Sequence, residues 1–520
     1  LIVDRIANFF PGNFSGNYTF NSLESFGRSL AGMAQRVPGD VSYLQAFAGT
    51  GTTGPTTSPN ILEHSEFVQD EWRARNNLTL TFGLRYDTQL MAQPTGQNPA
   101  ALAAGLDTGR IHNDHKDFGP RFGFAWTPLA SNRLVVRGGY GIFYGRTPSI
   151  MVGTAHSNNG LNVLTLNFSG SAIPQYSGAS PSCAPPSGGS SNPPIIFIFS
   201  PGYVQPQVQQ ASFGLEYELA KDLALTVSYL GVKGTHIQRT RDINLNPATI
   251  TSTVAVNNDP ATVVSFQRYV RPPRPIAAFD RIAQFESSSS SIYHGLILQL
   301  NKRFSHNFQF AASYTFGKAL DDNADATAVV PGGSDDAKLV QYSTNPHDDR
   351  GLSQNDQRHR FVVSGVWDLN NYAKSLPTLS KAILGGWELS GIFTAQKGQP
   401  YSGLVGFDLN NDGNSRADRF PGAGRDIFQL PGIVTLDPRI TRSIPIGETR
   451  KVQLILEAFN VFNRGNIFGV ITTQFTRAAT CTVASVSVCL TPSTTFGRPA
   501  STTFSSLSAR IVQLAAKFVF

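Results

Sequence analysis

Oxygen-bearing side chains recur at alternate positions in residues 408–418 (DLNNDGNSRAD). The first three are Asp408, Asn410 and Asp412. Gly413 follows at the sharp turn, so the stretch matches the first half of a calcium-binding loop. The second half differs, because the twelfth position is Arg419 instead of glutamate, with Asp418 beside it. One hypothesis is a structural calcium site formed by Asp408, Asn410, Asp412 and Asp418. The alternative is a plain turn, since Asn, Asp and Gly are good turn formers.

Two further patterns suggest chemistry but do not complete a motif. Residues 49–54 (GTGTTG) match the glycine spacing of a dinucleotide-binding turn, but Pro55 and Pro59 follow, so the required helix cannot begin there. The segment 348–350 (DDR) and His359 are compatible with a hydrolytic site, but we expect a solvated loop rim instead. The sequence contains no HExxH, GxSxG or CxxC motif. We therefore predict that the protein is not an enzyme and has no cofactor other than the calcium ion.

Cysteine is rare, with three residues in the chain. Cys481 and Cys489 lie close together in a loop-like stretch, and Cys183 lies far from both. A disulfide between the first two suits an oxidising compartment, and unpaired thiols are the alternative.

Alternating strands joined by short turns fill most of the chain after Glu66. In residues 78–87, leucine, phenylalanine and tyrosine alternate with polar or small residues, the pattern of a membrane barrel with an apolar outside and a polar inside. The same design recurs and predicts six hairpins. They pair 67–72 with 78–87, 121–126 with 133–144, 210–218 with 223–229, 292–303 with 308–316, 361–369 with 387–396, and 440–446 with 452–462.

The last stretch, residues 510–520, predicts the closing strand of this barrel. On a strand its even-numbered residues share one apolar face: Val512, Leu514, Ala516, Phe518 and Phe520. Eleven tilted residues rise about 25 Å, which is the height of the apolar band of an outer-membrane barrel. With two or three strands before Glu66, the expected total is about fifteen, within a range of 14 to 16.

The connections predict which rim faces which side of the membrane. Turns within hairpins are mostly short, and the connections between hairpins are long and rich in Gly, Pro, Ser and Asn. In outer-membrane barrels the short turns are periplasmic and the long loops extracellular. All four tryptophans lie beside the hairpin connections, where an aromatic girdle is expected. They are Trp72, Trp126, Trp367 and Trp387.

Composition agrees with strands and not helices as the membrane-crossing elements. Charged residues are 15% and hydrophobic residues 40% of the chain, with 48 Gly and 36 Phe. No apolar run reaches the 18 or so residues that a membrane-spanning helix needs. The net charge of +7, with a pI near 9.3, is too dilute over 520 residues to indicate a nucleic-acid partner.

Short motifs spread over the chain resemble the barrel of TonB-dependent receptors, especially the Oar-like group. They are 67–72 (FVQDEW), 80–87 (LTFGLRYD), 118–126 (FGPRFGFAW), 139–144 (GYGIFY), 228–236 (SYLGVKGTH), 313–318 (SYTFGK), 358–361 (RHRF) and 457–463 (EAFNVFN). The resemblance implies an all-β antiparallel barrel in the outer membrane. It also implies that the terminal aromatic residues Phe518 and Phe520 form a signal read by the barrel-assembly machinery. Family members carry a signal sequence, a TonB box, a plug and often a regulatory-like domain, none of which is recognisable here.

We therefore expect residues 1–520 to form the C-terminal portion of such a barrel, part of a probable 22 strands. The expected function is uptake of an unidentified extracellular substrate, with outer-membrane lipid as the surroundings and TonB engaged through the missing plug. A surface or adhesion protein that keeps the barrel without active uptake is the alternative. A barrel enzyme is disfavoured, because such enzymes use smaller barrels.

Overall fold

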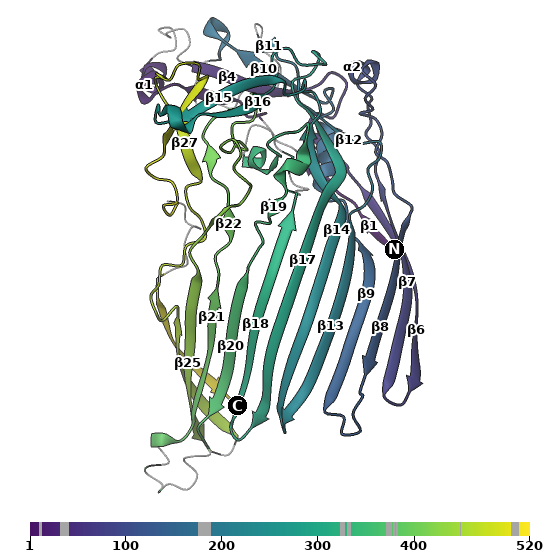
Figure 1. Cartoon of the computed structure of the whole chain (residues 1–520), viewed down its shortest axis with the longest axis vertical. Helices are drawn as coiled ribbons and strands as arrows, with labels where there is room; N and C mark the ends of the chain where they lie inside the picture. Colours follow the sequence, from purple (N-terminus) through teal and green to yellow (C-terminus); the bar gives the residue numbers. More distant parts are fainter. Residues whose placement is uncertain are drawn as a thin grey trace.

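A large antiparallel sheet dominates the computed structural model (Figure 1). The structure describes residues 1–9, 13–31, 41–174, 189–322, 328–329, 334–370, 377, 380, 383–447, 449–500 and 509–520. Cys183 lies outside these residues. The hydrogen-bonded order of the main sheet is β1-β6-β7-β8-β9-β13-β14-β17-β18-β20-β21-β25-β26-β29. We call these fourteen strands the wall. Two more short strands join it from the side, β12 on β17 and β19 on β18.

The wall strands are long enough to cross a membrane in most cases. Their bounds are β1 Ile2–Asp4, β6 Ile61–Arg75, β7 Leu78–Met91, β8 Asp117–Trp126, β9 Leu134–Tyr144, β13 Gln207–Ala220, β14 Leu223–Asp242, β17 Ile282–Ser305, β18 Phe308–Asp321, β20 His359–Asp368, β21 Trp387–Gln396, β25 Ile433–Ile446, β26 Arg450–Phe459 and β29 Ile511–Val519. The side strands are β12 Ile196–Phe199 and β19 Gly351–Leu352.

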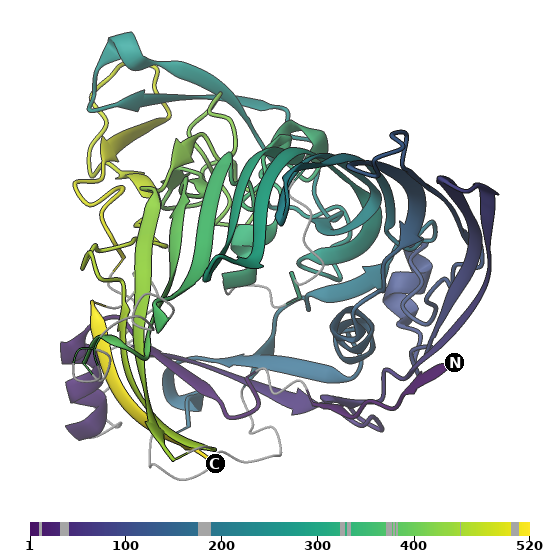
Figure 2. The ribbon, with the colours of Figure 1, turned by 90° about the horizontal axis from the view of Figure 1, so that it is seen from below.

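All six predicted hairpins are confirmed by the strand pairing, as is the final strand, which pairs with β26. The wall curves round from β6 to β29 when seen from below (Figure 2). Among the described residues no ladder joins β29 to β1 or β6, so the wall has two edges there. The predicted total of 14 to 16 strands agrees with the sixteen strands of this sheet.

The outer face of the wall is apolar and exposed to the surroundings. On β13, Phe213, Leu215 and Tyr217 are exposed large side chains at alternate positions, and Trp72 and Trp126 are exposed beside the short turns. Apolar surface of this extent is unfavourable in water and favourable in lipid. No described helix is both long and apolar enough to cross a membrane.

The long connections carry the remaining elements, above the end of the wall opposite the short turns (Figure 1). One sheet has the order β11-β10-β4-β3, and a five-stranded sheet, which we call the loop sheet, has the order β16-β15-β28-β27-β23. Their bounds are β3 Asn17–Phe20, β4 Val41–Ala48, β10 Val163–Phe168, β11 Ser190–Ser191, β15 Ile250–Val256, β16 Val264–Arg268, β23 Leu404–Val405, β27 Thr473–Arg477 and β28 Val488–Pro492.

Short elements complete the described fold. Two small pairs are β2 Asn8–Phe9 with β5 Thr56–Thr57, and β22 Pro400–Tyr401 with β24 Phe428–Gln429. The α-helices are α1 Leu23–Ala31, α2 Pro99–Ala103 and α3 Ser149–Ser157. The 3-10 helices are η2 Gly170–Ala172, η3 Pro260–Thr262, η4 Ser334–Lys338 and η5 Pro346–Asp349.

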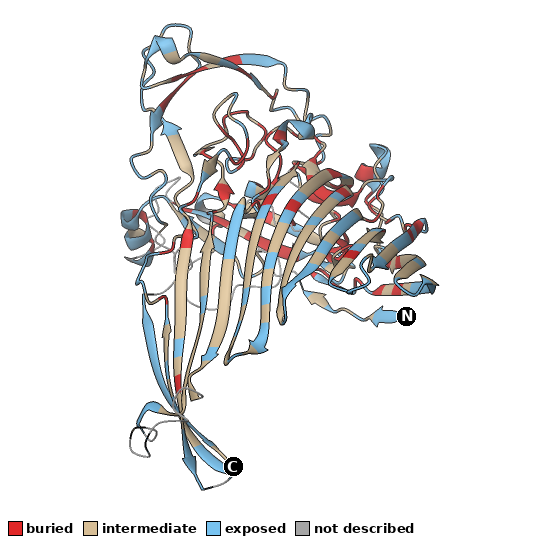
Figure 3. Ribbon diagram, turned by 60° about the horizontal axis from the view of Figure 1, so that its bottom comes forward, coloured by how far each residue is buried: buried red, intermediate tan, exposed pale blue. Residues whose placement is uncertain are grey.

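Buried residues are concentrated in the connections and at the upper ends of the strands, whereas much of the wall is exposed or half-buried (Figure 3). One apolar cluster surrounds Met151, Phe199 and Phe285, and another fills the loop sheet around Val254 and Leu490. The connections are therefore packed bodies with their own cores, because they bury apolar side chains as a soluble domain does.

One strand that we predicted before Glu66 forms outside the wall. Val41–Ala48 is a strand, β4, but its neighbours are β3 and β10. Of the described strands before β6, β1 belongs to the wall and pairs with β6 through Ile2, Val3 and Asp4. One face of β4 is buried, and its Tyr43 and Phe47 pack in an apolar cluster with Phe168 of β10, within the connections.

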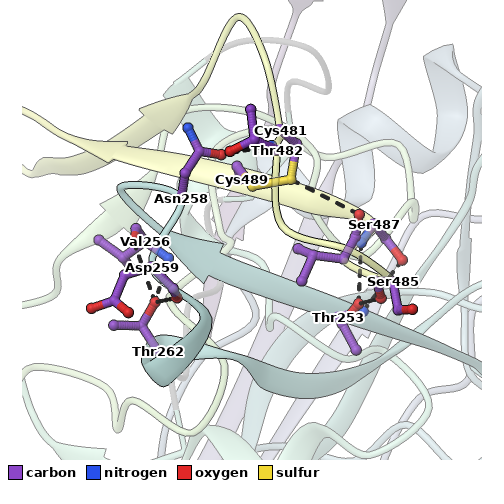
Figure 4. Close-up of a disulfide and its surroundings, with 11 residues drawn as sticks. Thr253, Val256, Asn258, Asp259, Thr262, Cys481, Thr482, Ser485, Ser487 and Cys489 are labelled. Carbon is purple, nitrogen blue, oxygen red and sulfur yellow. Dashed lines mark hydrogen bonds between the residues drawn. A yellow bond between two sulfur atoms is a disulfide. The ribbon is translucent and has the colours of Figure 1, made fainter.

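A disulfide bond joins Cys481 to Cys489 in the connection between β26 and β29 (Figure 4). Of the two alternatives, a disulfide or unpaired thiols, the structure therefore contains the disulfide. The cross-linked segment docks on β15, where the hydroxyl of Thr253 donates to the carbonyl oxygen of Ser485 at 2.9 Å. The amide of Thr482 donates to the side chain of Asn258 at 3.0 Å. The disulfide thus restrains the segment that carries β28 against the loop sheet.

Candidate functional site

The predicted calcium ligands lie together in the connection between β23 and β24. Asn410, Asp412 and Asp418 are buried, and Asp408 is half-buried. The segment folds back on itself because the amide of Val405 donates to the carbonyl oxygen of Asp418 at 2.7 Å. We call residues 408–418 the Asx loop. Its burial is unusual for a sequence so rich in polar residues, and polar groups in such a place must find partners.

Side-chain oxygens of the Asx loop accept hydrogen bonds from its own backbone. The carboxylate of Asp408 accepts from the amides of Asp412 at 3.1 Å and Gly413 at 2.9 Å. Asp418 accepts from the amides of Leu409 and Asn410 through one carboxylate oxygen, Oδ2. Gly413 has φ +96°, a backbone conformation that favours glycine at this turn. The loop is therefore a compact turn with carboxylates arranged along it.

The Asx loop also contacts segments from two other connections. Asn411 donates to the carbonyl oxygens of Tyr269 and Arg271, just after β16. Asn410 donates to the carbonyl oxygen of Gln341, and Asn414 to that of Asp336, both between β18 and β20. Three of the long connections thus meet at this loop.

Negative charge accumulates in the Asx loop. Burial and the charge of Asp408 raise the pKa of Asp412, and burial and the charge of Asp412 raise the pKa of Asp418. Within the described residues, no three His, Cys, Asp or Glu side chains form a ready cluster for a metal ion. Asp408, Asp412 and Asp418 are thus not grouped as a ready metal site. The side-chain oxygens of Asn410 and Asp412 accept from the amides of Asp412 and Asn414. The calcium site stays a prediction.

The residues weighed for hydrolysis are separated. His359 is on β20, where its Nδ1 lies 2.8 Å from the hydroxyl oxygen of Tyr314. Asp349 is buried and paired with Arg419, so the prediction of a solvated side chain is wrong for this residue. Asp348 is exposed, and its carboxylate accepts from Asn345. The acids and the histidine therefore have separate structural partners.

Buried arginines form a network that the sequence pattern did not identify. Arg239 on β14 is 1% exposed and lies 3.8 Å from the carboxylate of Asp322, which is fully buried. Asp322 also accepts from Arg350 at 2.6 Å and from the hydroxyl of Ser290 at 2.7 Å. Arg239 donates in addition to the carbonyl oxygen of Pro346 at 3.1 Å. We call these residues the arginine network. It fixes the connection between β18 and β20 to the wall.

The inner face of the wall is polar and hollowed. Ion pairs on this face join Arg85 to Asp87 at 2.9 Å and Arg439 to Glu457 at 3.1 Å. A cavity of about 550 Å³ opens along the inner face of β17, β18, β20, β21, β25 and β26. Its lining mixes polar side chains such as Gln309 and Ser364 with apolar ones such as Ile392 and Phe459.

The predicted assembly residues lie at the end of β29. Register places Phe518 opposite Val452 and Leu514 opposite Leu456, so Phe518, like Leu514, faces outward with the apolar side of β26. Phe518 and Phe520 stack with their ring centroids 6.1 Å apart and are both exposed. They form an aromatic pair on the lipid side of the wall.

A family model described as "Outer membrane beta barrel domain" matches residues 2–424. No curated protein matches the chain. Similar solved structures include the transporter YddB from Escherichia coli, with 11% identity, 92% of this chain and 50% of that chain covered, and a TM-score of 0.47. The FrpB iron transporter from Neisseria meningitidis is 12% identical, with 82% of this chain and 48% of that chain covered and a TM-score of 0.43. The ferripyoverdine receptor of Pseudomonas aeruginosa is 10% identical, with 92% of this chain and 44% of that chain covered and a TM-score of 0.44. The chain spans about half the length of these proteins.

Proposed function

Because the chain belongs to the outer membrane beta barrel domain family, we propose that it is the barrel of a TonB-dependent receptor of the Oar-like group, which takes up a substrate from the medium. Its location is the outer membrane. The observation that carries the proposal is the combination of a hollowed inner face that bears ion pairs with packed connections above it. A substrate recognised by the connections would pass along a polar surface, which suits transport.

The partners follow from this role. Outer-membrane lipid contacts the apolar outer face, the barrel-assembly machinery inserts the chain, and TonB supplies energy through a plug encoded elsewhere in the complete protein. The domain assignment, with residues 1–520 as the C-terminal portion of a 22-stranded barrel, stays a prediction. The substrate remains unidentified, and we propose that no reaction is catalysed. A complete gene sequence that encodes a TonB box and a plug would support the proposal of active transport.

Uptake is tested by comparing the spent media of three strains: the parent, a deletion of this gene and a deletion of TonB. For an active transporter, at least one compound is depleted by the parent and spared by both deletions, because uptake needs the receptor and its energy source. Equal media in all three strains, together with weaker surface attachment in the gene deletion, would favour the adhesion alternative.

We expect the aromatic pair at the end of β29 to act on assembly more than on stability. Burial of a whole Phe side chain is worth roughly 1.5 to 3 kcal/mol, and these two rings are exposed within the chain. The double substitution Phe518→Ala and Phe520→Ala should therefore lower the amount of folded protein in the outer membrane. Refolding of the purified variant in detergent should match that of the parent.

Leu514→Ala is the matched control, because Leu514 is on the same outward face of the same strand and is 82% exposed. Heat-modifiable migration on gels measures the folded fraction. If the double variant and the Leu514 variant reach the same outer-membrane level as the parent, the aromatic pair has no special role in assembly.

A further inference from the structure

Five basic side chains point outward at one level of the wall. They come from neighbouring strands of the sheet, β14, β17, β18, β20 and the end of β21, which lie side by side (Figure 1). Each is exposed and stands nine to eleven residues from the end of its strand that joins its hairpin partner. We call these residues the basic row: Lys233, His294, Lys318, His359 and Lys397.

The two histidines of the row contact aromatic rings of the outer face. The hydroxyl oxygen of Tyr229, a residue that is 42% exposed, lies 2.6 Å from Nδ1 of His294. The ring of His359 packs against Phe316, which is also exposed, with the two centroids 5.1 Å apart. The lysines share these outward faces because side chains at alternate positions of a strand point to the same side. They are Lys233 in line with Tyr229, Lys318 in line with Phe316, and Lys397 in line with Phe393.

Strand register brings the row together in pairs. His294 is directly opposite Lys318. The amide of Lys397 donates to the carbonyl oxygen of His359 at 2.9 Å, so these two residues are also neighbours across the sheet. Side chains opposite one another on one face have Cβ atoms about 4.5 to 5.5 Å apart. Lys233 is two residues beyond the partner of His294 on β14, within diagonal reach of it. Each pair can therefore contact one small group together.

The row marks the upper boundary of an apolar band. Between the row and the hairpin ends, the outward positions of these strands hold Leu, Val, Phe, Tyr, Trp, Ala and Gly. The exception is Lys302 near the lower end of β17, whose ammonium lies 4.4 Å from the ring centroid of Phe308. Ten tilted residues rise about 23 Å, close to the roughly 25 Å of apolar band in an outer-membrane barrel. The basic row is therefore where the headgroups of the extracellular leaflet begin.

The lysines of the row lack a counter-charge from the protein. In the described chain, no carboxylate lies within 4 Å of any of these three ammonium groups. Asp356, the acid nearest to His359 in the sequence, is buried and paired with Arg358 at 3.5 Å. Cations at the edge of hydrocarbon extend toward the headgroups, where anionic groups stabilise them. The charge of the row thus complements an anionic lipid surface.

We propose that the basic row binds the phosphate groups of anionic lipids in the extracellular leaflet. The ammonium of lysine is a compact charge that suits phosphate, and hydrogen bonds between charged partners are the strong ones. Where the hydroxyl of Tyr229 donates to Nδ1 of His294, Nε2 carries the hydrogen and can donate to the same phosphate as Lys318. His359 and Lys397 form the second such pair, and Lys233 adds charge beside the first. This binding does not depend on which substrate, if any, the barrel transports.

The test uses the full protein purified from outer membranes in detergent. It is titrated with phosphatidylglycerol, which has a net negative charge, or with phosphatidylcholine, which has none, and native mass spectrometry counts the lipid molecules retained. The parent should retain phosphatidylglycerol in preference to phosphatidylcholine. The preference should fall as the concentration of ammonium acetate is raised, because salt screens the attraction between exposed charges. Equal retention of the two lipids by the parent would overturn the proposal.

The row variant replaces all three lysines with glutamine: Lys233→Gln, Lys318→Gln and Lys397→Gln. One lysine near a charged membrane surface contributes about fivefold to binding, so this variant should retain phosphatidylglycerol roughly a hundredfold more weakly than the parent. Its retention of phosphatidylcholine should not change.

The control variant removes the same number of positive charges from the inner face of the wall. Arg303 lines the inner cavity, and Lys451 and Lys517 alternate with the outward residues of β26 and β29. The substitutions are Arg303→Gln, Lys451→Gln and Lys517→Gln, and this variant should bind phosphatidylglycerol like the parent. Heat-modifiable migration verifies that both variants fold. Equal loss in the two variants would mean that net charge, and not the basic row, selects the lipid.

Discussion

Leu215→Arg should reduce the folded fraction of the protein in lipid vesicles, with a loss of about 2 to 4 kcal/mol of stability. Leu215 is near the middle of β13 and is 39% exposed on the outer face, with Phe213 and Tyr217 on the same side. A guanidinium at this depth must leave water or distort the bilayer, because hydrocarbon does not solvate a charge. Unfolding by urea in vesicles, followed by heat-modifiable migration, measures the loss.

Ser212→Arg is the matched control on the same strand. Ser212 is on the opposite face from Phe213 and Leu215, and its side chain is exposed toward the interior of the wall. An arginine there can remain hydrated, so we expect a change of less than about 0.5 kcal/mol, as for ordinary surface substitutions. Equal losses for the two variants would mean that both faces are in the same surroundings, which would contradict the membrane orientation of the wall.

The strands of the wall were predictable because short-range sequence patterns determine where they lie and with which strand they pair. In β7, the alternation from Leu78 to Asp87 needs no knowledge of distant residues, and the turn between β6 and β7 fixes the pairing partner. The same holds for the other five hairpins. The face assignment of β29 was also local, and its register with β26 confirmed it. Strand and partner follow together wherever a short turn joins them.

The connections were not predictable in the same way, because their contacts join distant parts of the chain. In the loop sheet, Val254 on β15 pairs with Val488 on β28, and no turn between them indicates this register. The strand β4 shows the same limit: its sequence predicts a strand, but only its neighbours decide which sheet it joins. Pairing across long connections costs more chain entropy and is specified by packing, not by local pattern.

In the candidate site, too, local sequence spacing was predictable and contacts with distant segments were not. The spacing of Asp408, Asn410, Asp412 and Gly413 was readable, and the structure gathers these residues in one loop. The burial of Asp418 and its unpartnered oxygen depend on the packing of other connections around it. Arg239 gave no signal in the sequence, because an arginine near the end of a barrel strand usually reaches water.

Acid should loosen the arginine network. Although burial would raise the pKa of Asp322, hydrogen bonds from Ser290 and Arg350 and the charge of nearby arginines hold this pKa below its ordinary value of 3.8. A carboxylate with a depressed pKa stabilises the folded state at pH above the unfolded value. That contribution is lost as the pH falls below about 3.8 through the folded pKa. The carboxylate of Asp322 should thus stay ionised near neutral pH.

Asp322→Ala should open the connection between β18 and β20 at neutral pH, at a cost of about 3 to 5 kcal/mol. The substitution leaves Arg239, which is 1% exposed, as an uncompensated buried charge, whereas Arg350 can turn to solvent. Amide exchange in residues 341–353 should rise by two to three orders of magnitude, since about 1.4 kcal/mol corresponds to a factor of ten. Asp348→Ala, an exposed neighbour in η5, should change exchange little.

A second substitution separates lost charge balance from lost packing. If the penalty comes from the isolated guanidinium, Arg239→Met in the Asp322→Ala background should recover much of the protection, because an apolar side chain of similar length needs no counter-charge. The single variant Arg239→Met should be damaging in turn, since it removes the buried cation beside Asp322 and leaves that carboxylate with Arg350, Ser290 and His347. Additive losses in the double variant would instead show that the two side chains contribute independently, and that the 3.8 Å contact between them carries no coupling.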